Sequence, residues 1–348
     1  MARKVTFTSG SILAGNPITF RIQPNVLPNT PSFHRVIVEV KCGISGGNFE
    51  TIKLTAPVAI EGNDVEIDVS SAIRVPLESY EYSPDAATYP LCKWQLRVYD
   101  EYMDSGGAVH TQQGELYFPD KNNYYCCIAG AFSDYERLTS NGSKDVTKLS
   151  RKPTSSPQLT CVGETFAYTP AYATPQSLAS SGTLERPASK IVNVTTEGAQ
   201  TIDGHSLFVL PATEGLYRQT FRFINGFGVM ESINVPRVYS KKFTAESTPY
   251  VVSKQETFGS FSRSAVKKMN NKELWLFETD PLDEDWQQWY LHEFLMSEHV
   301  WIDMKGLWVP CTVLFNDDIT FDDITKSDAH VVSFTAQLDI NGSPTLSI

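Results

Sequence analysis

RVIVEVKC, residues Arg35 to Cys42, decides the fold class of this sequence, because every second residue in it is apolar. A period of two with one apolar face is the pattern of a β-strand that is buried on one side. The same alternation recurs at residues 65–69 and 92–99, and turn-forming residues separate these stretches at 43–48, 62–64 and 104–107. Short strands spaced by turns predict an antiparallel, immunoglobulin-like β-sandwich over residues 1–120.

The chain changes character over residues 121–190, where prolines punctuate a stretch rich in Ser and Thr. Proline removes a backbone donor and fixes φ, so regular structure should be short in this part of the chain. Phe166, Tyr168 and Tyr172 favour an extended arm that lies on a domain or on a neighbouring subunit, although a free linker is the alternative.

Residues 191–348 predict a second β-rich domain with one C-terminal amphipathic helix. Asn225-Gly226 predicts a hairpin turn between 216–224 and 229–235, and Lys305-Gly306 predicts another. Further strands are expected at 249–254, 256–262 and 332–340. The helix should span 281–297, with Asp280 as its N-cap and with an apolar, core-facing stripe formed by Leu282, Trp286, Trp289, Tyr290 and Phe294.

Charge is distributed unevenly along the 348 residues, which hold 29 Lys and Arg, 40 Asp and Glu and a net charge of −11. Residues 278–330 have 13 acids and two bases, whereas 237–272 have eight bases and two acids. These are either two solvated surfaces of opposite sign or complementary faces that join neighbouring copies. The second interpretation predicts an acidic patch and a basic patch between subunits: Asp317, Asp318, Asp322 and Asp323, and Arg237, Lys241, Lys242, Lys267 and Lys268.

No motif of catalysis, cofactor binding or metal ligation stands out. The glycines at 43–47 lack a following Gly-Lys-Ser/Thr, and Cys126-Cys127 lacks the two-residue gap of a redox or zinc pair. We therefore expect a protein that is not an enzyme and that has no cofactor and no metal ligands, although an ion in the acidic loop at 316–323 stays open. An acidic chain is a poor partner for duplex nucleic acid.

The first 20 residues have no apolar core of a signal peptide, and no apolar run approaches the ~20 residues that span a bilayer. The sequence thus predicts a protein that is neither secreted nor in a membrane, with its six cysteines reduced.

The order of these pieces resembles tail or baseplate structural proteins of Bacteroides-type bacteriophages and prophages. The stretch 217–228, YRQTFRFINGFG, followed by Met-Glu-Ser at 230–232, is the most specific part of the likeness. The helix ending at Ser297 with the strand at 300–302 comes next, and 16–20 and 67–70 add to it. The resemblance implies an all-β, oligomeric, non-enzymatic virion protein that is assembled in the host cytoplasm into a ring with copies of itself and other tail proteins.

Two other classes of function remain as alternatives. A carbohydrate-binding or host-adhesion module would stack sugars on exposed aromatic side chains, for which the candidates are Trp94, Tyr99, Tyr102, Trp301 and Trp308. A hydrolase would need a cleft with paired carboxylates, and no local pattern selects such a pair.

Overall fold

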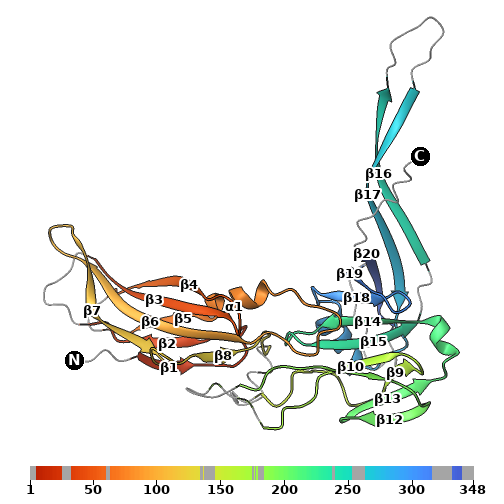
Figure 1. The fold of residues 1–348 in the computed structure, drawn as a ribbon, viewed down its shortest axis with the longest axis horizontal. Coiled ribbons are helices and arrows are strands. Elements are labelled where there is room, and N and C mark those ends of the chain that lie inside the picture. Colours follow the sequence, from red (N-terminus) through yellow and green to blue (C-terminus); the bar gives the residue numbers. More distant parts are fainter. Residues whose placement is uncertain are drawn as a thin grey trace, which may run out of the picture. The chain divides into compact units, whose positions relative to one another are not determined.

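The computed structural model describes residues 5–25, 33–59, 63–133, 136, 146–174, 176, 178, 184–236, 240–252, 263–315 and 331–338. The chain forms two compact units, each with its own sheets and core (Figure 1). Unit 1 comprises Met1–Ser150, Thr169–Lys190 and Gly226–Val229. Unit 2 comprises Arg151–Tyr168, Ile191–Asn225 and Met230–Ile348.

Unit 1 contains two antiparallel sheets. The larger has the order β4-β3-β6-β7, and β8 pairs with the start of β6; its strands are β3 (Phe33–Ile44), β4 (Glu50–Pro57), β6 (Cys92–Met103), β7 (Val109–Phe118) and β8 (Tyr125–Cys127). The smaller has the order β1-β2-β5, from β1 (Val5–Ser9), β2 (Thr19–Ile22) and β5 (Val65–Asp68).

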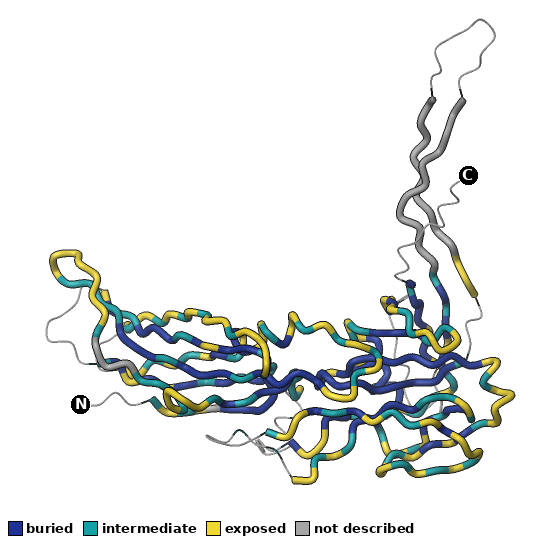
Figure 2. The backbone as a smooth tube through the Cα atoms, viewed as in Figure 1, coloured by how far each residue is buried: buried dark blue, intermediate teal, exposed yellow. Residues whose placement is uncertain are grey.

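The two sheets of unit 1 share one hydrophobic core, which is drawn dark blue in Figure 2. Val36, Val38 and Val40 contribute the buried face of β3, as their alternation predicts. Trp94 of β6 is fully buried, and its indole Nε1 donates to the Cys127 thiol at 3.0 Å. Helix α1 (Ser70–Glu78) adds Ala72, Ile73 and Leu77 to this core.

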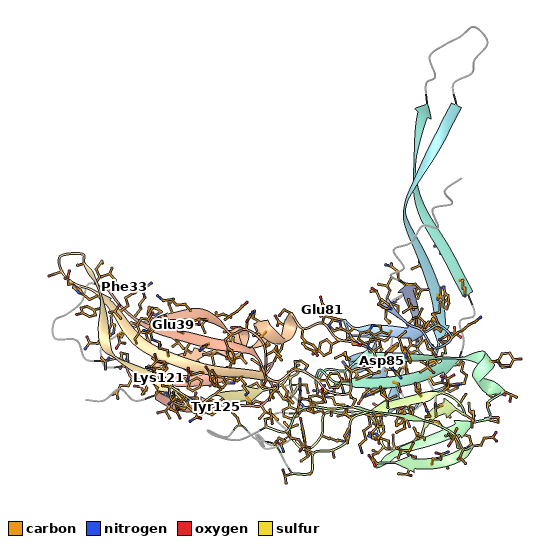
Figure 3. All side chains as sticks on the ribbon, in the orientation of Figure 1. Phe33, Glu39, Glu81, Asp85, Lys121 and Tyr125 are labelled. Carbon is orange, nitrogen blue, oxygen red and sulfur yellow. The ribbon has the colours of Figure 1, made fainter. Side chains whose placement is uncertain are left out.

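The opposite face of the larger sheet is charged, and its charges pair across neighbouring strands. Glu39 of β3, labelled in Figure 3, accepts hydrogen bonds from Arg97 and Tyr99 of β6, both at 2.9 Å. Arg35 forms an ion pair with Glu101 in the same way. These pairs therefore neutralise charge between β3 and β6.

Unit 2 is built on a seven-stranded antiparallel sheet with the order β15-β14-β18-β19-β20-β17-β16. Its strands are β14 (Arg218–Ile224), β15 (Met230–Pro236), β16 (Ser240–Val252), β17 (Arg263–Glu278), β18 (Val300–Asp303), β19 (Trp308–Phe315) and β20 (Ser333–Leu338). The hairpins predicted at Asn225-Gly226 and Lys305-Gly306 are confirmed, because β14 pairs with β15 and β18 with β19.

Short strands form a second layer beside β15. A mixed sheet has the order β12-β13-β9, from β9 (Gln158–Cys161), β12 (Gly198–Ile202) and β13 (His205–Leu210), and β10 (Thr165–Tyr168) pairs with β11 (Lys190–Asn193). Strands β9 and β13 run parallel. Gln158 and Ala167 both donate to Ser232 of β15, to its carbonyl and its hydroxyl, at 2.8 Å. All seven residues of β14 are buried, and the turn η1 (Glu214–Tyr217) precedes them.

The helical segment of unit 2 differs from the predicted helix at 281–297. The α-helix α3 spans Glu284–Trp289 and continues as a π-helical turn, η2 (Tyr290–Phe294). The N-cap is Asp283, whose carboxylate accepts from the Trp286 backbone N–H at 3.0 Å, and not Asp280. Asp280 instead forms an ion pair with Arg218 of β14. The expected stripe faces the core, because Trp286, Trp289, Tyr290 and Phe294 are all buried against the sheet.

The prediction of a mainly β protein is confirmed, while an immunoglobulin-like arrangement of unit 1 stays a prediction. The connecting segment predicted at 121–190 divides between the units, and its Phe166 and Tyr168 lie in a small core of unit 2 with Leu207 and Val209. The strand predicted at 249–254 forms the end of the longer β16 as far as Val252, and the strand predicted at 256–262 lies outside the described residues.

Candidate assembly surface and buried charges

The β16–β17 hairpin extends beyond the rest of its sheet (Figure 1). Strand β17 pairs with β20 only from Glu273 to Glu278, but it pairs with β16 from Arg263 to Leu276. Within the described part of the chain, the outer ten residues of β17, Arg263–Lys272, therefore have β16 as their single partner strand. We call Ser240–Val252 together with Arg263–Lys272 the basic ribbon.

The basic ribbon has six bases and one acid, a net charge of +5. Because the whole chain carries −11, the remainder carries −16. Register places Lys267 opposite Thr248, Lys268 opposite Ser247 and Lys272 opposite Thr244, so bases occur along the length of the ribbon rather than at one end. A ribbon of this sign suits an acidic partner.

Lys241 anchors the root of the ribbon to the core of unit 2. Its ammonium Nζ lies 3.5 Å from the centroid of the Trp275 ring, and Trp275 belongs to the buried cluster under the sheet. A cation over an indole face is attracted by the ring quadrupole. Lys242, the next residue, is exposed.

The end of β17 leads into an acidic segment, Glu278–Asp285. The stretch 278–303 contains eight Asp and Glu and neither Lys nor Arg. Asp280 and Asp283 have structural partners, since Arg218 holds the first and Ser156 donates to the second at 2.6 Å. Glu278, Glu284 and Asp285 are exposed, so they supply the negative surface charge of the segment.

A cavity of about 500 Å³ adjoins this segment within unit 2. Its walls come from α3–η2 and from the chain just before β9: Arg151, Lys152, Pro153, Thr154, Ser155, Asp285, Gln288, Trp289, His292 and Glu293. Arg151 forms an ion pair with Glu293, which is almost fully buried. The cavity thus has acidic and basic groups on its walls, and part of this charge is already paired.

Lys152 is the most deeply buried cation of this cluster, with 5% of its surface exposed. Its ammonium lies 4.8 Å from the centroid of the Phe166 ring and 5.3 Å from that of Trp289. Burial lowers the pKa of Lys152 to about 8, and the fully buried Glu231 opposes that shift. Lys152 also reaches the Ser232 carbonyl at 3.5 Å, which joins the chain before β9 to the edge strand β15.

The structure brings four of the five predicted basic residues together: Lys241, Lys242, Lys267 and Lys268 all belong to the basic ribbon. Arg237 and the predicted acidic patch, Asp317, Asp318, Asp322 and Asp323, lie outside the described residues. The same holds for the acidic loop considered as an ion site. The pairing of these two patches between subunits therefore stays a prediction.

Sequence reasoning missed the basic ribbon as a single element and missed the acids at the start of α3 as a separate surface. Residues 240–252 and 263–272 mix Lys, Ser, Thr and Asn with few large apolar residues, so no clean alternation marks two long strands. The register shift between Thr244 and Glu246 breaks the periodicity further. The signal that could have revealed the ribbon is the presence of basic residues on both sides of residues 253–262.

Five of the six cysteines are buried, and Cys126 is half-buried. Cys42, Cys92 and Cys127 are fully buried, all six are free thiols, and burial raises the pKa of Cys42 to about 11. A thiol held protonated is a poor nucleophile and a poor metal ligand. In the described ranges, no group of three His, Cys, Asp or Glu side chains could hold a metal ion.

The aromatic side chains considered for sugar stacking do not form an open face. Trp94 is fully buried, and Tyr99 and Trp301 are below 9% exposed. The Arg222 guanidinium covers the Trp308 ring at 4.0 Å from its centroid, and Tyr102 stacks on His110. This burial argues against a carbohydrate platform made from these five residues, because sugar stacking requires accessible ring faces.

Comparison with known proteins yields no relative: neither a family model, nor a curated protein, nor a solved structure matches the chain. Among the described residues, no helix has the length and hydropathy needed to cross a membrane.

Proposed function

We propose that this chain is a structural assembly subunit, of the class found in phage tail tips and baseplates, that joins copies of itself through the basic ribbon. The likeness of residues 217–228 and 297–302 to tail proteins motivates the phage setting.

The basic ribbon is the observation that carries the proposal. An isolated two-stranded hairpin is marginally stable in water, because it has neither a third strand nor a core on its face. Exposed strand edges also invite pairing with another chain. Among the residues that the structure describes, ten residues of β17 extend past β20 with β16 as their partner strand, which favours a ribbon that is completed by a partner.

The distribution of charge supports the same role. The ribbon carries clustered bases, whereas the rest of the chain has a strong acidic excess. Two copies therefore attract each other where the ribbon of one meets an acidic surface of the other, and they repel each other where two acidic surfaces meet. Such a contact is heterologous, and heterologous contacts build rings or open filaments.

Shortening the ribbon tests this function. Replacement of residues 247–268 by Asn-Gly joins Glu246 to Met269, which face each other in the register, through a two-residue hairpin turn. The paired root and the contact with β20 are retained. We expect the full chain to self-associate with rising concentration in sedimentation velocity, and the shortened variant to stay monomeric with a far-ultraviolet circular dichroism spectrum that is still that of a folded, mainly β protein.

A full-length chain that stays monomeric at all concentrations would contradict the proposal. Equal self-association of the full and shortened chains would contradict it as well, since the ribbon would then be dispensable.

A further inference from the structure

The partner surface of the basic ribbon can be identified from reach and charge within unit 2. Lys268 precedes Glu278 by ten residues on β17, which corresponds to about 33 Å along an extended strand. The two residues are therefore far apart along the same strand.

The acids at the end of β17 and before α3 are held in place on unit 2. Arg218 of β14 forms an ion pair with Asp280, and Ser156 donates to Asp283. The separation along β17 leaves the outer bases of the ribbon to meet such acids on another molecule.

The acidic segment Glu278–Asp285 has exposed carboxylates that a basic partner could contact. Glu278, Glu284 and Asp285 are exposed, and the stretch around them contains neither Lys nor Arg up to residue 303. Asp285 also lies on the wall of the 500 Å³ cavity, so the surface beside these acids is hollowed. Asp280 and Asp283 are tied to Arg218 and Ser156, which holds the segment in place without using the three exposed carboxylates.

We infer that the basic ribbon of one copy docks on the acidic segment Glu278–Asp285 of a second copy, so that the part of β17 containing Lys267, Lys268 and Lys272 lies against the part of that copy containing Glu278, Glu284 and Asp285. This inference rests on the proposed function, because it names the partner of the same ribbon. The contact is heterologous: each copy donates its ribbon and receives another.

A charge swap tests the contact directly. One variant reverses the ribbon (Lys267→Glu, Lys268→Glu and Lys272→Glu), and the other reverses the segment (Glu278→Lys, Glu284→Lys and Asp285→Lys). Each variant alone places like charges opposite each other, so we expect self-association about tenfold weaker or more. An equimolar mixture restores opposite charges in both contacts, and we expect its association to return to within about threefold of the unmodified chain.

The matched control reverses three exposed acids elsewhere, Glu50→Lys, Glu81→Lys and Glu197→Lys, with the same change in net charge. Its association should stay within about threefold of the unmodified chain, because the contact is local and not a response to net charge. If the segment-reversed variant does not fold, Glu278→Gln, Glu284→Gln and Asp285→Asn removes the charges more gently and should also weaken association. Far-ultraviolet circular dichroism monitors folding in every variant.

The outcomes separate the inference from the proposed function. A mixture that associates no better than either variant alone, or a segment-reversed variant that associates like the unmodified chain, would overturn the acidic segment as partner. If the ribbon-shortened chain is still monomeric in that case, the assembly role stands and the ribbon binds another surface. If the ribbon-shortened chain associates like the unmodified chain, the proposed function is wrong, and the inference that rests on it is wrong as well.

Discussion

Lys152 carries an ammonium group into the interior of unit 2, where it lies over two aromatic rings. A buried cation costs free energy unless nearby groups compensate for its lost hydration. Glu231, which is fully buried, opposes the lowering of the Lys152 pKa, and the Ser232 carbonyl accepts from the ammonium. Even so, burial dominates, and the pKa stays well below the ordinary value of 10.5.

This lowered pKa predicts a pH dependence of stability. Between about pH 8 and the ordinary pKa of 10.5, the unfolded chain binds more protons at Lys152 than the folded chain does, so the free energy of unfolding gains as pH rises. Lys152→Met removes that gain. We expect the stability of the unmodified chain relative to Lys152→Met, from urea unfolding, to increase by about 2 kcal/mol between pH 7 and 10.

The unmodified chain has to be compared with Lys152→Met because other groups change the free energy of unfolding in the opposite direction as pH rises. Burial raises the pKa of Cys42 to about 11 and that of Cys92 to about 12, so the stability that these thiols contribute is lost as pH rises above 9. That loss is common to both chains and cancels in the difference. A difference independent of pH would show that Lys152 keeps an ordinary pKa.

At the scale of elements, the sequence correctly predicted that an aspartate caps α3, but it selected Asp280 where the structure has Asp283. Asp280 precedes the whole apolar stripe and Asp283 precedes its members from Trp286 onward, and either fits the N-cap pattern. The difference lies in tertiary contacts. Arg218, buried in β14, requires an anion and takes Asp280, which leaves Asp283 to cap the helix.

The two aspartates should therefore differ on replacement. Asp283→Ala loses the cap and should lower the free energy of unfolding by about 1 kcal/mol, with Asp283→Asn closer to the unmodified chain. Asp280→Ala should cost more, about 3 kcal/mol, because Arg218 is 7% exposed at its side chain and would keep its charge without that anion. Urea unfolding at pH 7 measures both, and a larger loss for Asp283→Ala would reverse the assignment.

Much of the sheet structure could be predicted from the sequence, and the failures have physical causes. Val36, Val38 and Val40 alternate because one face of β3 is buried, and Asn225-Gly226 marks the turn after β14. Helix α1 was not predicted, since it is short and contains Pro76. Strands β9 and β10 lie in a proline-rich stretch and depend on partners such as β13 and Ser232, which are distant in the chain.

The candidate site was predictable in composition but not in geometry. Four of the five chosen bases fall in one hairpin because they were selected as a charge cluster, which is a property of sequence. The extension of that hairpin past β20 depends on where β20 ends, and no local pattern around Lys267 or Lys268 reports it. Likewise, the distinction between engaged and exposed acids at 278–285 depends on Arg218 and Ser156.

At the scale of the whole molecule, the net charge of −11 conceals a +5 ribbon on a −16 remainder. Added salt screens exposed charges, since the Debye length falls several-fold between about 0.05 M and about 0.5 M ionic strength. We expect self-association to weaken by at least about tenfold over this range in sedimentation velocity. Association that is constant or stronger in high salt would indicate an apolar contact instead of a charged one.

The chain passes between its two units several times, since unit 1 takes up residues 169–190 and 226–229 after unit 2 has begun at Arg151. Neither unit is thus encoded by an uninterrupted stretch of the gene. A ribosome must deliver residue 229 before unit 1 has all its pieces, and no single truncation point yields either unit intact. Dissection of this protein will accordingly require circular permutation or engineered junctions rather than simple fragments.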